Sequence, residues 1–216
     1  MDKENYRKRI IDKTVAEYLS MFGAVCIEGP KWCGKTWTSS FHSSSEIFMG
    51  DPSGNFQNRQ LAQMSPNLIL DGKTPRLIDE WQEVPPIWDA VRYEVDRRGK
   101  NGQFILTGSA TPNHKGIMHS GAGRIAKIRM HTMSLYESGD SSGVVSLSEL
   151  CRGIFTPSMT GEVSLKNIIE LIIRGGWPGS LGGGIYESPV LANEYLNAVI
   201  DDDVYRIDGI RRDSVK

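Results

Sequence analysis

The sequence predicts an α/β domain followed by a smaller appendage. Three observations lead to this fold class: short apolar runs alternate with segments of helical periodicity, one glycine-rich turn joins such a run to a helix, and the composition changes at about Met133. With 216 residues, of which 39% are hydrophobic and 24% charged, the chain can bury roughly 70% of its unfolded surface. We therefore expect a globular protein that folds without disulfides.

The first expected elements are a helix and a strand. Residues 5–22 place apolar side chains at helical intervals, and Gly23 supplies a stop. The short apolar run Ala24–Ile27 then indicates a buried strand, which leads directly into a glycine-rich turn and a helix that opens at Gly34. This order aims the helix's N-terminal amides and the positive end of its dipole at a bound anion.

The turn itself, EGPKWCGKTW, contains GxxxxGK followed by Thr, the pattern of a phosphate-binding P-loop. The glycines let the backbone curl around an anion, Lys35 reaches the outer phosphates, and Thr36 offers a hydroxyl to Mg²⁺. Because such a loop contacts phosphates rather than a base, we expect the indoles of Trp32 and Trp37 to pack against neighbouring helices. The expected binding residues are Gly29, Pro30, Lys31, Trp32, Cys33, Gly34, Lys35, Thr36 and Trp37.

A P-loop site also needs an acid at the end of an apolar strand to hold Mg²⁺. Two aspartates compete for this role. Asp71 follows the more apolar run, Leu68–Leu70, whereas Asp79 ends a shorter run but is followed at once by Glu80. The adjacent pair supplies one carboxylate for the metal and another that can orient or deprotonate a water, so Asp79 and Glu80 are favoured.

Two further helices and a strand are expected before the middle of the chain. Glu46–Gly50 indicates a strand, and a helix covers residues 56–64. Residues 85–99 begin with two prolines and end with glycine, which is typical of a helix, and its apolar face includes Trp88. We therefore expect Trp88 to lie in the core.

Two more strands complete the expected sheet. Phe104–Leu106 predicts a buried strand that ends in polar residues, among them Thr107 and Ser109. Polar side chains at the carboxyl end of a strand lie where open α/β sheets bind ligands, so one of these two can sense the outer phosphate. A last strand is expected over Ile125–Met130, preceded by a flexible segment that carries Arg124.

The remainder of the chain indicates a connector and helices. The stretch from Ser134 to Glu162 is rich in Ser and Gly and contains at most one short helix. Ser164 caps the next expected helix and Gly175 stops it, and another helix covers Pro189–Val204. The predicted domains are a nucleotide-binding core, residues 1–135, and a connector with a helical lid, residues 136–216.

Composition limits the classes of partner. A formal net charge of −1 removes the main electrostatic argument for tight binding to nucleic acid or to a membrane surface, although it does not exclude a local basic patch. No apolar run approaches a membrane span, and the start MDKENYRKRI is too charged for a signal peptide. We expect a cytoplasmic protein. The three cysteines lack the spacing of a zinc site.

Five segments together resemble a widespread family of largely uncharacterised prokaryotic AAA+-like ATPases: GPKWCGKTW, PRLIDEWQEVPPIWDAVRYEVD, FILTGSA, GAGRIAKIRMHTMSLYESGDSSG and IIRGGWPG. The resemblance covers nearly the whole chain. Many families share the P-loop, but LIDEWQ combined with ILTGS and SLYESGDSSG is more specific. The resemblance implies a parallel five-stranded sheet with the P-loop strand central, flanked by helices and followed by a small helical lid.

The resemblance also implies roles for individual residues. The nucleotide-binding loop is matched by Gly29, Gly34, Lys35 and Thr36, the Mg²⁺ acid by Asp79, the catalytic acid by Glu80, and the sensor by Thr107 or Ser109. Family members usually continue into a second domain that resembles restriction-nuclease folds, and residues 195–216 look like the junction leading to it. We expect that domain to be missing here, and Asp201–Asp203 to be a solvated helix end rather than a metal site.

The leading functional hypothesis is Mg²⁺-dependent binding and hydrolysis of ATP, which drives or gates a protein partner or the missing domain. ATP is chosen over GTP by resemblance and because no NKxD motif is present. An arginine that stabilises the transition state is expected, either in the chain or from a neighbouring subunit of a homo-oligomer. Arg124 and Arg174 are candidates, and an ordinary salt bridge is the alternative for each.

Two other functions compete with this hypothesis. The first is a regulatory switch or interaction module that binds nucleotide without hydrolysing it. Glu80 favours hydrolysis, whereas the missing domain favours dependence on something absent. The second is a small-molecule kinase, which would need an arginine-rich lid that the segment after Met133 does not clearly offer.

Overall fold

The computed structural model describes residues 3–109, 117–155, 157–159, 161–184 and 186–200. The chain divides into two compact units, Met1–Thr132 and Met133–Lys216. Within the described residues, no helix is both long enough and apolar enough to cross a membrane.

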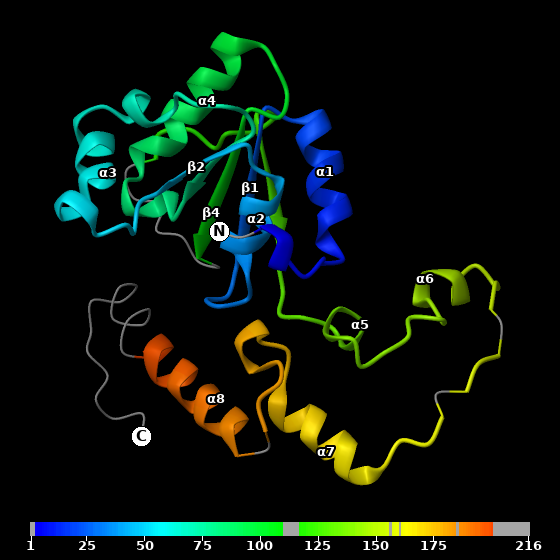
Figure 1. Cartoon of the computed structure of the whole chain (residues 1–216). Coiled ribbons are helices and arrows are strands. Elements are labelled where there is room, and N and C mark those ends of the chain that lie inside the picture. Colours follow the sequence, from blue (N-terminus) through cyan, green and yellow to red (C-terminus); the bar gives the residue numbers. More distant parts are fainter. Residues whose placement is uncertain (1–2, 110–116, 156, 160, 185, 201–216) are drawn as a thin grey trace. The chain divides into compact units, whose positions relative to one another are not determined.

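The first unit is built on a five-stranded sheet in the order β2-β3-β4-β1-β5. Every neighbouring pair of strands is parallel, which confirms the predicted fold class. β4 holds the middle position and β1 lies beside it (Figure 1). The P-loop strand is therefore interior but not the middle strand that the resemblance implied. The strands are β1 Ala24–Gly29, β2 Ser45–Phe48, β3 Arg76–Asp79, β4 Phe104–Ser109 and β5 Ile125–Arg129.

Helices cover both faces of this sheet, and Figure 1 shows α1 on the opposite side from α3 and α4. Successive side chains of a strand point to opposite faces. In β1, Ala24 and Cys26 pack with Trp88 of α4, whereas Val25 and Ile27 pack with Val15 of α1. Both faces of β1 are thus buried, as an interior parallel strand requires. The helices of this unit are α1 Ile11–Met21, α2 Lys35–His42, α3 Ser53–Met64 and α4 Pro86–Arg98.

Three elements of this unit compare with the sequence prediction as follows, two of them differing and one agreeing closely. The first helix begins at Ile11 rather than at residue 5. Residues 54–56 of α3 have left-handed backbone angles, so the regular helix starts after them, close to the predicted start. The apolar run before Asp71 is a 3₁₀ turn, Pro66–Ile69, and not a strand, because its Ile69 packs beneath α4 instead of joining the sheet.

Helix α4 carries a compact charge cluster at its C-terminal end. Glu94 accepts hydrogen bonds from Arg97 at 2.6 and 2.7 Å and from Arg98 at 2.5 Å. These guanidinium groups, first that of Arg97, lower the pKa of Glu94 to about 2. Gly99 then ends the helix with φ 60°, and Trp88 is 2% exposed, as predicted.

Replacing Glu94 by Gln is expected to destabilise the chain by about 1 kcal/mol at neutral pH, a modest value because Arg97 stays largely in solvent. The folded pKa lies below the unfolded value, so this stabilisation is present above pH 4.5 and disappears as the pH falls toward 2. Urea denaturation of both proteins across this range measures the difference. The exposed Glu17→Gln is the control. A Glu94→Gln difference that stays constant down to pH 2 would contradict the assignment.

Among its described residues, the second unit contains short helices and one strongly amphipathic helix, α7, Leu165–Arg174. Ser134 and Glu137 form a reciprocal capping box at the first of them, and Ser164 caps α7 by accepting from the Asn167 amide, as predicted for Ser164. The connector holds two short helices, whereas the sequence analysis expected at most one. The predicted end of α8 at Val204 lies outside the described residues, as does Asp201–Asp203. The helices are α5 Leu135–Ser138, α6 Leu147–Leu150, α7 Leu165–Arg174 and α8 Glu187–Ala198.

Candidate functional site

The glycine-rich loop lies between the end of β1 and the start of α2. Gly29 ends the strand, and a Cβ added there would lie 2.4 Å from the carbonyl oxygen of Met130, so no larger residue fits without movement. Gly34 has φ 101°, in the left-handed region that favours glycine, and α2 begins at the next residue. The two glycines of the motif therefore have separate structural reasons, one of packing and one of backbone angle.

Lys35 is nearly buried at the mouth of this loop. Its side chain is 5% exposed, and its ammonium donates to the carbonyl oxygens of Gly29 at 3.0 Å and Pro30 at 2.8 Å. Burial raises the pKa values of Asp79 and Glu80, and the positive charge of this ammonium opposes that rise. One cation therefore faces both the loop and the two acids.

Thr107 joins the ends of two neighbouring strands at the acids. Its hydroxyl is fully buried, donates to the Asp79 carboxylate at 2.7 Å and accepts from the Glu80 backbone amide at 2.9 Å. In the bond between them, the Thr107 hydroxyl is the donor and the Asp79 carboxylate oxygen is the acceptor. The side chain of Ser109, the other predicted sensor, lies outside the described part of the structure.

Asp79 and Thr36 form an oxygen pair suited to a hard cation. Burial is the main cause that raises the pKa of Asp79, and hydrogen bonds from Thr107 and then Thr36 oppose it. A carboxylate and a hydroxyl are the ligand types that Mg²⁺ takes from proteins, so the donor set fits this ion. The residues that could hold Mg²⁺ are thus the two named from the sequence.

Asp71, the competing acid, lies elsewhere. It precedes β3, whereas Asp79 ends that strand, so the two aspartates lie at opposite ends of β3. The Asp71 side chain is 94% exposed, and its nearest charged partner is Arg98 at 4.0 Å. The geometry therefore places Asp79, and not Asp71, beside the loop.

Glu80 stands at a sharp turn directly after the strand. Its backbone is left-handed, with φ 57°, an unfavourable angle for a residue with a side chain. Burial raises the pKa of its carboxyl, and a hydrogen bond from the Gln82 amide counteracts this rise. No sequence pattern pointed to Gln82. Its approach to Glu80 depends on the turn at that residue, and the sequence analysis did not predict the turn.

The two candidate arginines are paired within the chain. Arg124 donates to Asp96 at 2.8 Å, and its carbonyl accepts from the amide of Ala24, at the amino end of β1 and away from the loop. Arg174, in the second unit, donates to Asp140 at 2.6 Å. The salt bridges that the sequence analysis named as the alternative are therefore present for both.

The loop tryptophans are surface residues. Trp32 is 56% and Trp37 41% exposed, so the prediction that these indoles pack against neighbouring helices is wrong. Trp37 lies in α2, where small hydroxyl side chains, those of Thr38, Ser39 and Ser40, take buried positions.

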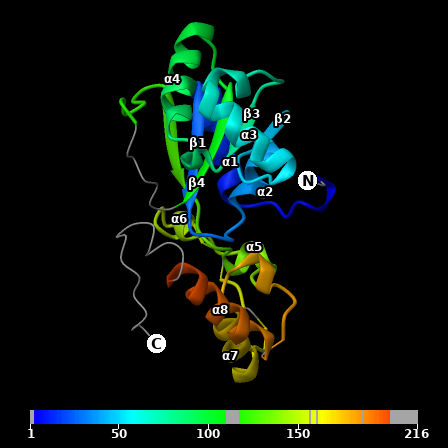
Figure 2. The ribbon, with the colours of Figure 1, turned by 90° about the vertical axis from the view of Figure 1, so that its left-hand side faces the viewer.

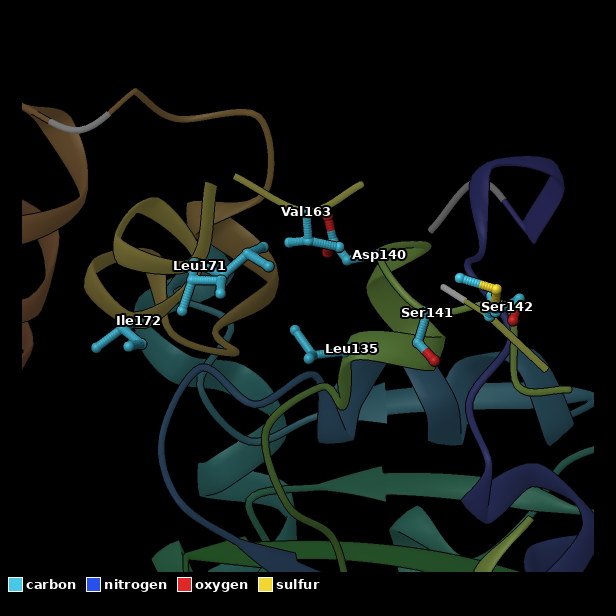
Figure 3. Close-up of a pocket in the computed structure, with 9 residues that line it drawn as sticks. Leu135, Asp140, Ser141, Ser142, Val163, Leu171 and Ile172 are labelled. Carbon is cyan, nitrogen blue, oxygen red and sulfur yellow. The ribbon is translucent and has the colours of Figure 1, made fainter. Parts of the chain in front are cut away.

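A separate hollow of about 560 Å³ lies within the second unit. Figure 3 shows Leu135 of α5 and Leu171 and Ile172 of α7 along it, with Asp140 and Val163 nearby. Its lining is mainly apolar and includes no predicted site residue. Neither the glycine-rich loop nor the two acids contribute to its lining.

Comparison with known proteins matches the part of the chain that contains these residues. The family model described as "AAA domain" matches residues 22–139, which include the loop, both acids and Thr107. Two curated relatives, uncharacterized proteins of Mycobacterium bovis and Mycobacterium tuberculosis, are each 30% identical over 121 residues. The match covers 55% of this chain but only 27% of either relative. The chain thus spans about a quarter of the length of these relatives.

Two solved structures are also similar. C. elegans PCH-2 is 17% identical with a TM-score of 0.36, and the match covers 72% of this chain and 50% of that one. A Walker-type ATPase of Pyrococcus abyssi is 12% identical with a TM-score of 0.48, and the match covers 98% and 77%.

Proposed function

The chain belongs to the AAA domain family of AAA+-like P-loop ATPases, and we propose that it binds ATP with Mg²⁺ at its glycine-rich loop and hydrolyses the terminal phosphate. The observation that carries this proposal is the meeting of three separate segments. Lys35 from the loop, Asp79 and Glu80 from the end of β3, and Thr107 from β4 share one cluster of contacts.

The loop and the adjoining helix bind the phosphates in this proposal. The amides at the start of α2 and the ammonium of Lys35 supply positive charge to the phosphate oxygens. Thr36 and Asp79 would hold Mg²⁺, which when bound neutralises charge on the outer phosphates. Thr107 fixes the Asp79 carboxylate, so the acid keeps its orientation.

Glu80 is the proposed catalytic carboxylate, acting as a base toward the attacking water. Its carboxylate orients a water for in-line attack on the terminal phosphorus and accepts a proton from that water, while the bond from this phosphorus to the bridging oxygen breaks and the electron pair leaves with the diphosphate. Gln82 donates to the Glu80 carboxylate and holds it in place. Gln82 is thus a positioning residue rather than a second acid.

Turnover is proposed to drive or gate a protein partner or a further domain. Support comes from the relatives, of which this chain spans 27%, and from the second unit that follows the core. A homo-oligomer in which a neighbouring copy supplies an arginine belongs to the same proposal, with Arg124 and Arg174 as the candidates.

Phosphate release from saturating MgATP tests the proposed function, with Lys35→Ala as the blank. Release above the blank supports a complete ATPase site within these residues. If the chain binds MgATP but releases no phosphate, alone and at high protein concentration, hydrolysis is the wrong proposal and the nucleotide switch replaces it. Failure to bind MgATP would contradict both.

The choice between the two aspartates gives a matched pair of variants. Asp79→Asn is expected to lower turnover by about 10²-fold or more. It should also raise the Mg²⁺ concentration needed for half-maximal turnover, because a metal-holding carboxylate is lost. Asp71→Asn removes the same charge from an exposed site and should leave turnover unchanged. Titration of the rate with Mg²⁺ measures both. Equal effects of the two substitutions would contradict the assignment of Asp79.

A further inference from the structure

Arg9, upstream of the first strand, reaches the P-loop from behind. It is 8% exposed, so its charge is almost removed from solvent. One guanidinium nitrogen donates to the carbonyl of Cys33 at 2.8 Å, and the other donates to the carbonyl of His131 at 2.8 Å. A buried cation that donates to two backbone carbonyls has a defined geometric effect on that backbone.

The first bond orients the loop amide that follows it. Cys33 is joined to Gly34 by a trans peptide, in which the C=O and the N–H of the planar unit point in opposite directions. Arg9 holds the Cys33 carbonyl toward its guanidinium, so the N–H of Gly34 points away from Arg9. Donation to a carbonyl also polarises the peptide and strengthens its N–H as a donor. Arg9 thus prepares one amide of the phosphate cradle.

The second bond reaches the chain that leaves the sheet after β5. This exit segment, residues 130–132, runs beside the loop: the amide of Met130 donates to the carbonyl of Glu28 at 2.7 Å, and the Met130 carbonyl closes over Gly29. It is the stretch that connects the first unit to the residues of the second. Arg9 therefore bridges the loop and the exit segment directly.

Other contacts keep the segment of Arg9 fixed on α2. The hydroxyl of Tyr6 lies 2.9 Å from that of Thr38 and donates to Asp12 at 2.7 Å. Asp12 accepts from the backbone amide of Arg9 at 2.7 Å and contacts His42, at the far end of α2, at 3.1 Å. The backbone at Arg9 is thus held by Tyr6 before it and Asp12 after it in the sequence.

We infer that Arg9 is a positioning residue for nucleotide binding, and that it couples phosphate binding in the loop to the exit segment at His131. This inference rests on the proposed function. A phosphate that draws the Gly34 amide inward moves the Cys33 carbonyl of the same rigid peptide, and Arg9 transmits that movement to the His131 carbonyl.

Hydrogen–deuterium exchange of the full chain with and without MgATP tests the coupling. The expected result is protection of two peptides, one covering residues 29–37 and one covering residues 128–134. Protection of the loop alone would overturn the inference and leave the proposed function intact. No protection of the loop would contradict the proposed function, and the inference with it.

Variants at Arg9 separate positioning from simple stability. Arg9→Met is expected to weaken MgATP affinity about 10-fold or more, since two charge-assisted bonds are lost, and to abolish the nucleotide-dependent protection at 128–134. Arg9→Lys, which keeps the charge but reaches one carbonyl, should restore part of the affinity. Lys13→Met, at a side chain 85% exposed, is the control. Unchanged affinity in Arg9→Met would overturn the inference. An Arg9→Lys protein that keeps both full affinity and the protection at 128–134 would overturn it as well.

Discussion

Replacing Lys35 by Ala is expected to abolish measurable binding of MgATP, with affinity lowered by roughly 100-fold or more. The ammonium is nearly buried, so it acts in surroundings where charge is weakly screened, and each charge-assisted bond contributes about 1.5–3 kcal/mol. Its removal also leaves Asp79 and Glu80 without the cation that favours their ionised forms. Two acids then face the phosphates with less opposing charge.

Calorimetric titration with MgATP measures this loss. Lys166→Ala is the control, because the side chain of Lys166 is 81% exposed and forms a surface pair with Glu170. Thermal denaturation of each variant shows whether the fold is retained. A folded Lys35→Ala protein that binds MgATP as tightly as the wild type would mean that the loop does not hold the phosphates.

Replacing Glu80 by Gln is expected to keep MgATP binding and to lower turnover by about 10²–10⁴-fold, the usual contribution of a positioned acid or base. The substitution retains the size of the side chain, and the new amide still carries an oxygen that accepts from Gln82. It removes the negative charge that takes a proton from the attacking water. Binding and turnover should therefore separate.

Single-turnover phosphate release and equilibrium binding together measure this separation. Glu83→Gln is the matched control, since Glu83 lies three residues further on and pairs with Arg59 at 3.0 Å. Normal turnover in Glu80→Gln would show that another group activates the water. Loss of binding in Glu80→Gln would show that Glu80 shapes the loop rather than the reaction.

The fold was predictable because local residue order carries most of it. Short apolar runs located four of the five strands to within three residues at each end, and the run ending at Asp79 located the remaining strand once the acids were weighed. The prolines and the glycine that bound α4 act through fixed backbone preferences, which do not depend on distant contacts. The prediction for Trp32 and Trp37 was wrong because the burial of a side chain depends on its neighbours in space, which the local sequence does not specify.

The sequence by itself determined the loop, because Gly29, Gly34, Lys35 and Thr36 lie so close together in the chain that their spacing alone predicts a phosphate-binding turn. Only the tertiary structure decided which acid faces that loop and which residues support it. Parallel strands bring their carboxyl ends to one edge of the sheet, so Asp79 meets Thr107, 28 residues away, while Asp71 stays at the other end. Arg9 reaches its carbonyls in the same way, through packing that no local pattern records.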